Sequence, residues 1–162
     1  MTIRHAVAVL LAGGALVLSP SLAEADITAF LGSLRTAAPQ TVRGVAVGGT
    51  LIVVGVELEY ANSSEDVVSA TPGLTTGMAS AIVRTPTGRV QAYGTVGAGI
   101  YRETLGGATN TNAALCIGGG VTVGLAGPFG VRVDYRILSL RNAMSATAAT
   151  PKRFYAGVNF KF

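Results

Sequence analysis

The chain has 162 residues, of which 49% are hydrophobic and 12% are charged, with 22 glycines and a formal net charge of +4. No apolar run of about 18 residues follows residue 25, which excludes a spanning helix there. The basic residues are scattered singly, without the basic patch or helix of a nucleic-acid-binding protein, and the lone Cys116 excludes an intramolecular disulfide.

The first 25 residues have the layout of a cleaved secretory signal peptide. Arg4 and His5 give a short positive start, and residues 6–18 form an apolar core that is too short for a membrane helix. Small residues at Ala23 and Ala25 surround the expected cut. We therefore predict export through the Sec pathway, cleavage after Ala25 and one domain over residues 26–162, with a retained anchor helix as the alternative.

Eight strand candidates follow the signal peptide, with no long helical periodicity between them. They are Ile27–Arg35, Arg43–Thr50, Ile52–Ala61, Thr75–Arg84, Arg89–Arg102, Thr111–Leu125, Phe129–Leu140 and Lys152–Phe162. Many strands at this spacing predict an all-β sandwich or barrel.

The expected connections alternate in length along the chain. Short ones lie at residues 50–51, 85–88 and 126–128, and long ones at residues 36–42, 62–74, 103–110 and 141–151. An up-and-down barrel whose two ends lie in different compartments has this arrangement, with short periplasmic turns and longer outside loops. A sandwich has no reason to alternate so regularly.

Each strand candidate has one apolar face and one face that carries the charges. In Phe129–Leu140, for example, Val131 and Val133 alternate with Arg132 and Asp134, because successive strand side chains point to opposite faces. A soluble barrel places the apolar face inside, whereas a membrane barrel places it toward lipid. Aromatic residues near strand ends and glycine-rich polar faces favour the membrane form.

The charges on the polar faces have both signs, which is what a narrow lumen of low dielectric requires. We predict a structural charge network in the lumen, composed of Glu57, Glu59, Arg132, Asp134, Arg136, Arg153 and Lys161.

The last strand candidate, K-R-F-Y-A-G-V-N-F-K-F, alternates apolar and polar residues and ends on an aromatic residue. It resembles the terminal strand of outer-membrane β-barrels, where a final Phe closes the barrel and is read by the assembly machinery. The resemblance implies that Phe154, Phe160 and Phe162 serve barrel closure and the assembly signal, with this strand joined to Ile27–Arg35.

Over residues 26–162 the chain resembles the small outer-membrane β-barrel family that includes OmpA-, OmpX- and opacity-like proteins. Segments Gly55–Tyr60, Gly97–Tyr101 and Val131–Arg136 carry the resemblance. It implies an eight-stranded antiparallel up-and-down transmembrane β-barrel in the outer membrane of a Gram-negative-type bacterium. The implied partners are outer-membrane lipid and the barrel-assembly machinery.

The fold does not give the function, because members of this family differ in activity. Barrel enzymes that deacylate lipid A use a His–Ser pair, and the only histidine here, His5, leaves with the signal peptide. Gly118-Gly119-Gly120 lacks the lysine of a phosphate loop. We expect no catalytic, cofactor-binding or metal site.

The resulting prediction is a monomeric structural or surface protein with a polar lumen filled by side chains, no nucleic-acid partner and an unidentified partner for its loops. One alternative is a narrow channel, since Gly97, Gly99, Gly118 and Gly120 leave room in the lumen. The other alternative is a soluble exported barrel that binds a ligand.

Overall fold

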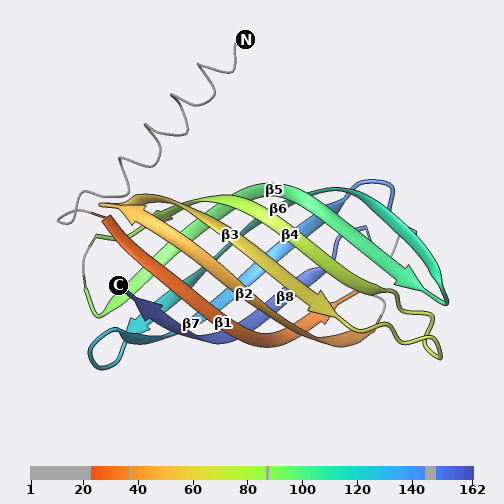
Figure 1. Ribbon diagram of the computed structural model, residues 1–162, viewed down its shortest axis with the longest axis horizontal. Helices are drawn as coiled ribbons and strands as arrows, with labels where there is room; N and C mark the ends of the chain where they lie inside the picture. The colour runs from red at the N-terminus through yellow and green to blue at the C-terminus, as the bar shows by residue number, and fades with distance from the viewer. Residues whose placement is uncertain (1–22, 37, 87, 145–148) are drawn as a thin grey trace, which may run out of the picture.

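In the computed structural model, which describes residues 23–36, 38–86, 88–144 and 149–162, eight strands close into one antiparallel barrel (Figure 1). The strands are β1 (Ala23–Arg35), β2 (Pro39–Leu51), β3 (Val54–Ser63), β4 (Gly73–Arg84), β5 (Val90–Leu105), β6 (Ala108–Gly124), β7 (Phe129–Leu140) and β8 (Lys152–Lys161). Each strand pairs with its neighbours in chain order, and β8 pairs with β1. The predicted fold class is confirmed, including closure of the ring by the last strand.

Strand β1 begins earlier than the sequence predicts. Residues 1–22 of the predicted signal peptide lie outside the described residues, but its last three residues form the start of β1. No helix in the part of the chain that the structure describes is long and apolar enough to cross a membrane.

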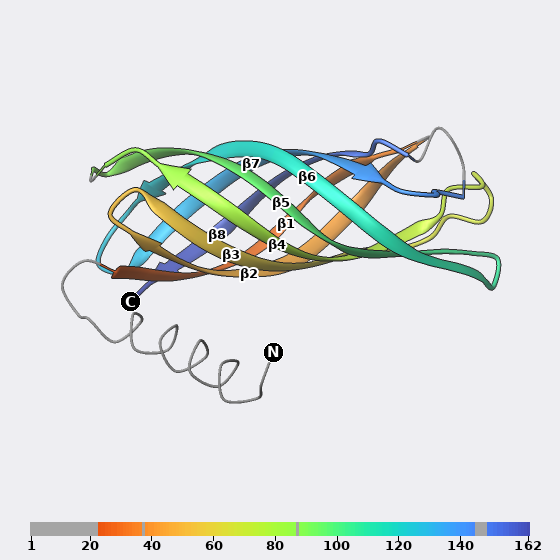
Figure 2. The same ribbon diagram turned by 90° about the horizontal axis from the view of Figure 1, so that it is seen from above.

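The strand register sets the width of the barrel. Starting at Ala25 of β1 and following the paired residues once around the ring, the path returns to β1 at Arg35, ten residues further along the same strand. A ring of eight strands with this stagger has its strands tilted by about 35–45°, and its interior is just wide enough for side chains to fill. Figures 1 and 2 show the tilt.

The connections depart from the predicted alternation at two places. Residues 103–110, expected to be a long loop, contain a two-residue turn at Gly106 and Gly107, whose φ angles are 57° and 86°. Positive φ at both central residues matches the twist of the flanking strands, so the hairpin closes tightly. The long loop expected at residues 36–42 is also wrong, because β1 and β2 are joined by residues 36–38.

The β5–β6 hairpin therefore extends beyond the rest of the barrel at the loop end (Figure 2). Its strands of 16 and 17 residues are the longest of the eight described. The two other long connections, residues 64–72 and 141–151, occur as predicted and lie at the same end. The start of β1 and the end of β8 lie at the opposite end, which carries the short turns (Figure 1).

Apolar side chains cover the outside of the barrel, and charged side chains fill the inside. Val56 and Leu58 are 70% and 66% exposed, whereas Arg132 and Arg136 are 0% exposed. This polarity is the reverse of that of a soluble barrel and fits a barrel surrounded by lipid. The alternative of a soluble exported barrel is therefore wrong.

Aromatic side chains lie near both edges of the apolar outer surface. Tyr60, Tyr135 and Phe154 are exposed toward the loop end, and Phe129 and Phe160 are exposed at the turn end, with ring centroids 5.4 Å apart. Girdles of this kind mark the two membrane interfaces of a transmembrane barrel.

The lumen is less polar than predicted. An apolar cluster occupies inward positions toward the loop end, with Leu34, Val42, Leu74, Leu138 and Leu140 among its members. In β7, Leu138 and Leu140 continue the inward face of Arg132, Asp134 and Arg136 toward the loop end. Most charges of the predicted network occupy the middle of the lumen, whereas buried Glu103 lies near the loop end, and buried Asp26 and Arg84 lie at the turn end.

A charge on the outer surface tests the assignment of inside and outside. We expect Val133→Arg to lower the free energy of unfolding by about 2–4 kcal/mol, because Val133 is exposed in the middle of β7, whereas Arg near an interface costs about 0–1 kcal/mol. Denaturant unfolding in lipid vesicles measures the free energy of unfolding of the variant and of the parent protein.

The matched control is Ser139→Arg, on the same face of the same strand at its loop end. Equal losses for the two variants would contradict the proposed depth of Val133 in the membrane.

Candidate functional site in the barrel lumen

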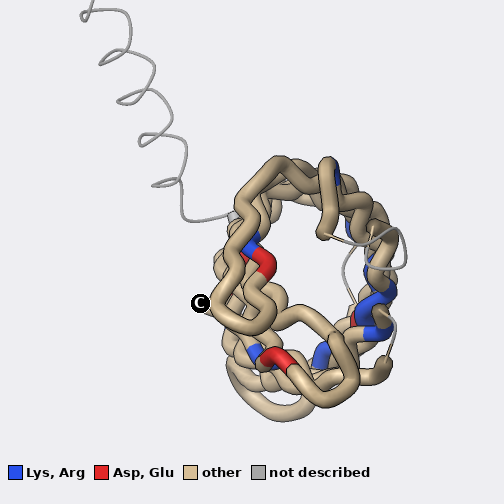
Figure 3. The backbone as a smooth tube through the Cα atoms, turned by 90° about the vertical axis from the view of Figure 1, so that its right-hand side faces the viewer, with Lys and Arg blue, Asp and Glu red and all other residues tan. Residues whose placement is uncertain are grey.

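Six charged side chains meet in the middle of the lumen, and we call them the lumen network. They are Glu57 and Glu59 from β3, Arg132, Asp134 and Arg136 from β7, and Arg153 from β8. Positions two apart on a strand share a face, so each strand delivers its charges inward together. Strands β3 and β7 lie across the ring from each other, and Figure 3 shows this ring from its loop end.

Glu57 joins the two walls of the barrel. Its Oε1 accepts hydrogen bonds from Arg136 Nη2 at 2.6 Å and from Arg132 Nη2 at 3.3 Å, and its Oε2 pairs with Arg132 Nη1. All three side chains are fully buried. Hydrogen bonds between charged groups are among the strongest in proteins, so this contact braces β3 against β7.

Asp134 lies between the same two arginines. Arg136 Nε donates to its Oδ1 at 3.0 Å, and Arg132 Nη2 donates to its Oδ2 at 3.1 Å. The hydroxyl of Tyr93 also donates to Asp134 and accepts from Arg132 Nε at 2.6 Å. Tyr93 is thus part of the site, although it is absent from the charge network that the sequence predicts.

Arg153 extends the network toward β1 and the loop end. It pairs with Glu59, which also contacts Arg136 at 3.1 Å. Its guanidinium lies 5.7 Å from the ring centroids of both Phe30 and Tyr155, which stack on each other at 3.9 Å. Three arginines and three carboxylates balance each other, so the lumen network carries no net charge.

Lys161 is not part of the lumen network. The structure places it at the turn end of the barrel, where its Nζ lies 3.2 Å from Glu24 and 2.7 Å from Gln91. A further buried pair, Asp26 and Arg84 at 2.6 Å, was missed by the sequence reasoning. Both residues lay at the edges of the expected strands, where inward and outward positions are hardest to assign.

Two glycines make room for the buried side chains. A Cβ on Gly118 would lie 2.8 Å from Arg136 Cγ, and one on Gly120 would lie 2.5 Å from the Tyr93 hydroxyl. The same two atoms would also approach backbone oxygens of β7 within 2.3 Å. The glycines of β6 therefore give space to the large side chains of the network and its neighbour Tyr93.

The ion pairs of the lumen network keep its carboxylates and guanidinium groups charged and fixed in position. Each of its carboxylates is ion-paired with at least one arginine, and an arginine stays protonated in proteins. The residues that the structure describes contain no group of three or more His, Cys, Asp or Glu side chains placed to hold a metal ion.

Comparisons with known proteins agree with this architecture. A family described as "Outer membrane protein beta-barrel domain" matches residues 19–162. Neisserial surface protein A has a similar structure, with a TM-score of 0.70, 19% sequence identity, and coverage of 86% of this chain and 97% of that chain. A comparison with curated proteins found no match.

Two other solved structures are similar at lower TM-scores. The N-terminal β-barrel domain of Pseudomonas aeruginosa OprF has a TM-score of 0.59 and 19% identity, over 86% of this chain and 97% of that chain. The outer membrane enzyme PagL has a TM-score of 0.54 and 11% identity, over 83% of this chain and 98% of that chain. At these identities the likeness shows the fold alone.

Breaking the lumen network is expected to destabilise the barrel. Glu57→Gln leaves Arg132 and Arg136 buried with excess positive charge, and we expect a loss of about 3–5 kcal/mol in the free energy of unfolding. Denaturant midpoints of the protein refolded into lipid vesicles measure it.

The control is Lys161→Gln, which replaces a cation at the partly exposed turn end, where its Nζ lies 2.7 Å from Gln91, and should cost at most about 1 kcal/mol. A Glu57→Gln protein as stable as this control would show that the network does not brace the barrel.

Proposed function

The chain belongs to the family of outer membrane proteins with a β-barrel domain, and from this premise we propose that it serves in the outer membrane as a structural barrel with a closed lumen, without catalysis or conduction. The observation that carries the proposal is the lumen network, which joins β3 to β7 and β8 through fully buried arginines.

The packing of the lumen supports closure. Arg132, Arg136 and Arg153 are at most 1% exposed, and the apolar cluster around Leu138 covers them on the loop side. A cavity of about 360 Å³ opens at the turn end, but none of its lining residues belongs to the lumen network. The glycines that suggested a channel lie against side chains and backbone of neighbouring strands.

The absence of catalysis is part of the proposal, because the fold alone leaves activity open: PagL is an outer membrane enzyme with a similar barrel. The support comes from the residues. The only histidine in the sequence is His5, in the predicted signal peptide, and the buried carboxylates are held by arginines. A Ser nucleophile would lack its ordinary base.

Conductance across a planar bilayer tests closure. We expect no discrete steps from the refolded parent protein, because its lumen is filled. The variant Glu57→Ser/Arg132→Ser/Arg136→Ser removes three side chains from the middle of the lumen and should conduct, which also shows that the assay detects this barrel. Reproducible steps from the parent would contradict the proposal and favour the narrow channel.

We further propose that the last strand directs assembly. Phe160 and Phe162 face outward, and β8 pairs with β1 from Asp26, the partner of Lys161, to Arg35, the partner of Lys152. A strand that completes the ring in this way presents its aromatic residues to the barrel-assembly machinery before closure. The protein is proposed to act as a monomer.

Export through a cleaved signal peptide of residues 1–25 completes the proposal, and the intact mass of the protein purified from outer membranes tests it. The expected mass corresponds to a chain that starts at Asp26. A mass that includes Glu24 and Ala25 would contradict this cut. Such a chain would keep the contacts of Glu24 with Lys161 and of Ala25 with Phe162.

A further inference from the structure

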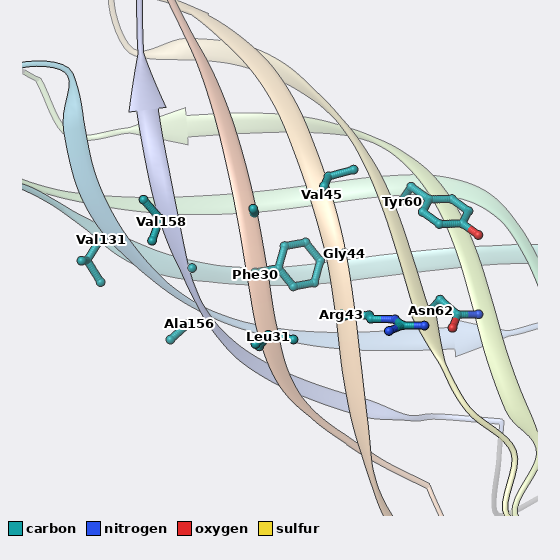
Figure 4. Close-up of a pocket in the computed structure, with 12 residues that line it drawn as sticks. Phe30, Leu31, Arg43, Gly44, Val45, Tyr60, Asn62, Val131, Ala156 and Val158 are labelled. Atoms are coloured by element: carbon teal, nitrogen blue, oxygen red, sulfur yellow. The ribbon is translucent and has the colours of Figure 1, made fainter.

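The outer surface of the barrel has an apolar groove where β1 meets β8 and β2 (Figure 4). Its volume is about 780 Å³. The outward side chains Ala29 and Ala156 are small, while Leu31, Val45 and Val158 rise around them. The groove lies on the surface that faces lipid, and its lining suits hydrocarbon.

A second hollow lies beside the groove, nearer the loop end. It measures about 490 Å³ and is lined by Ser33, Arg35, Tyr135, Lys152 and Phe154. Arg35 of β1 and Lys152 of β8 are direct register partners, so their charges lie together. Arg35 is on the same face of β1 as Leu31, four residues further along, which makes the two hollows neighbours.

A third cation, Arg43, stands at the rim of the apolar groove. It is the register partner of Leu31 on β1 and of Asn62 on β3. The side chains of Arg43 and Asn62 both line this rim of the groove (Figure 4). Among the described residues, no carboxylate forms an ion pair with Arg35, Arg43 or Lys152, and all three are exposed.

We propose that the two hollows together form the binding site of one phosphorylated lipid of the outer leaflet. Its acyl chains lie in the apolar groove, and its phosphates contact Arg35, Arg43 and Lys152. Three observations select this occupant. The surface is the one that lipid covers, the cations lie at the loop end, which faces the outer leaflet, and their charges are complementary to phosphate. This site is separate from the lumen and does not depend on whether the lumen conducts.

The charge arm of the test uses diphosphoryl lipid A as the probe. The refolded barrel is titrated with it in a neutral detergent, and lipid adducts are counted by native mass spectrometry. We expect one tightly held lipid on the parent. Arg35→Gln/Arg43→Gln/Lys152→Gln should weaken its affinity by roughly 100-fold, at about fivefold for each cation near a charged lipid head.

A charge-matched control separates a site from general attraction. Arg89→Gln/Arg102→Gln/Arg141→Gln removes the same net charge from exposed positions outside both hollows, and its affinity should stay close to that of the parent. An equal loss in both triple variants would overturn the proposal, as would equal binding of lipid A from which the phosphates have been removed.

The groove arm leaves every cation in place. Ala29→Leu/Ala156→Leu fills the groove and should reduce the affinity clearly, whereas Ala79→Leu/Ala98→Leu, on paired outward positions of β4 and β5, should not. Unchanged binding to the filled groove would overturn the acyl-chain contact. Heat-modifiable gel mobility, measured for every variant, verifies that each barrel has folded.

Discussion

The pairing of β8 with β1 is the constraint on which the rest of the structure depends. Lipid offers no hydrogen-bond partners, so every backbone N–H and C=O in the membrane must be bonded within the ring. Closing the ring with eight strands and a stagger of ten residues leaves a lumen that side chains fill. The width of the lumen, and therefore its chemistry, follows from how the backbone closes.

A narrow lumen that contains charges must balance them. Burying one unpaired charge is costly, whereas three arginines and three carboxylates with good geometry compensate for their loss of water. Arginine suits this role because its planar guanidinium bonds two partners at once, as Arg136 does with Glu57 and Asp134. Gly118 and Gly120 of β6, the strand that pairs with β7, supply the space that such large groups need.

Within the strands, the sequence was sufficient to predict the six inward charges of the lumen network, because a strand alternates faces with a period of two and a one-residue error would expose every charge to lipid. The sequence was not sufficient to predict where a strand ends, because that depends on the local conformation of a turn. The turn at Gly106 and Gly107 looked like part of a loop because its flanking Thr109 and Asn110 are polar, yet both lie in a strand. Partners across the ring, such as Tyr93 for Asp134, depend on register, which alternation does not reveal.

The projecting β5–β6 hairpin leaves part of one strand without a neighbour in the sheet. β6 pairs with β7 only from Ala114 onward, so in residues 108–112 one side of β6 is a free sheet edge in water. Free edges invite pairing with other chains, and proteins protect them with polar side chains and local covers. Here Asn110 donates to the carbonyl of Asn142 at 2.6 Å, and the backbone N–H of Arg141 donates to Ala113. The residues after β7 thus shield a strand edge that would otherwise promote association between neighbouring barrels.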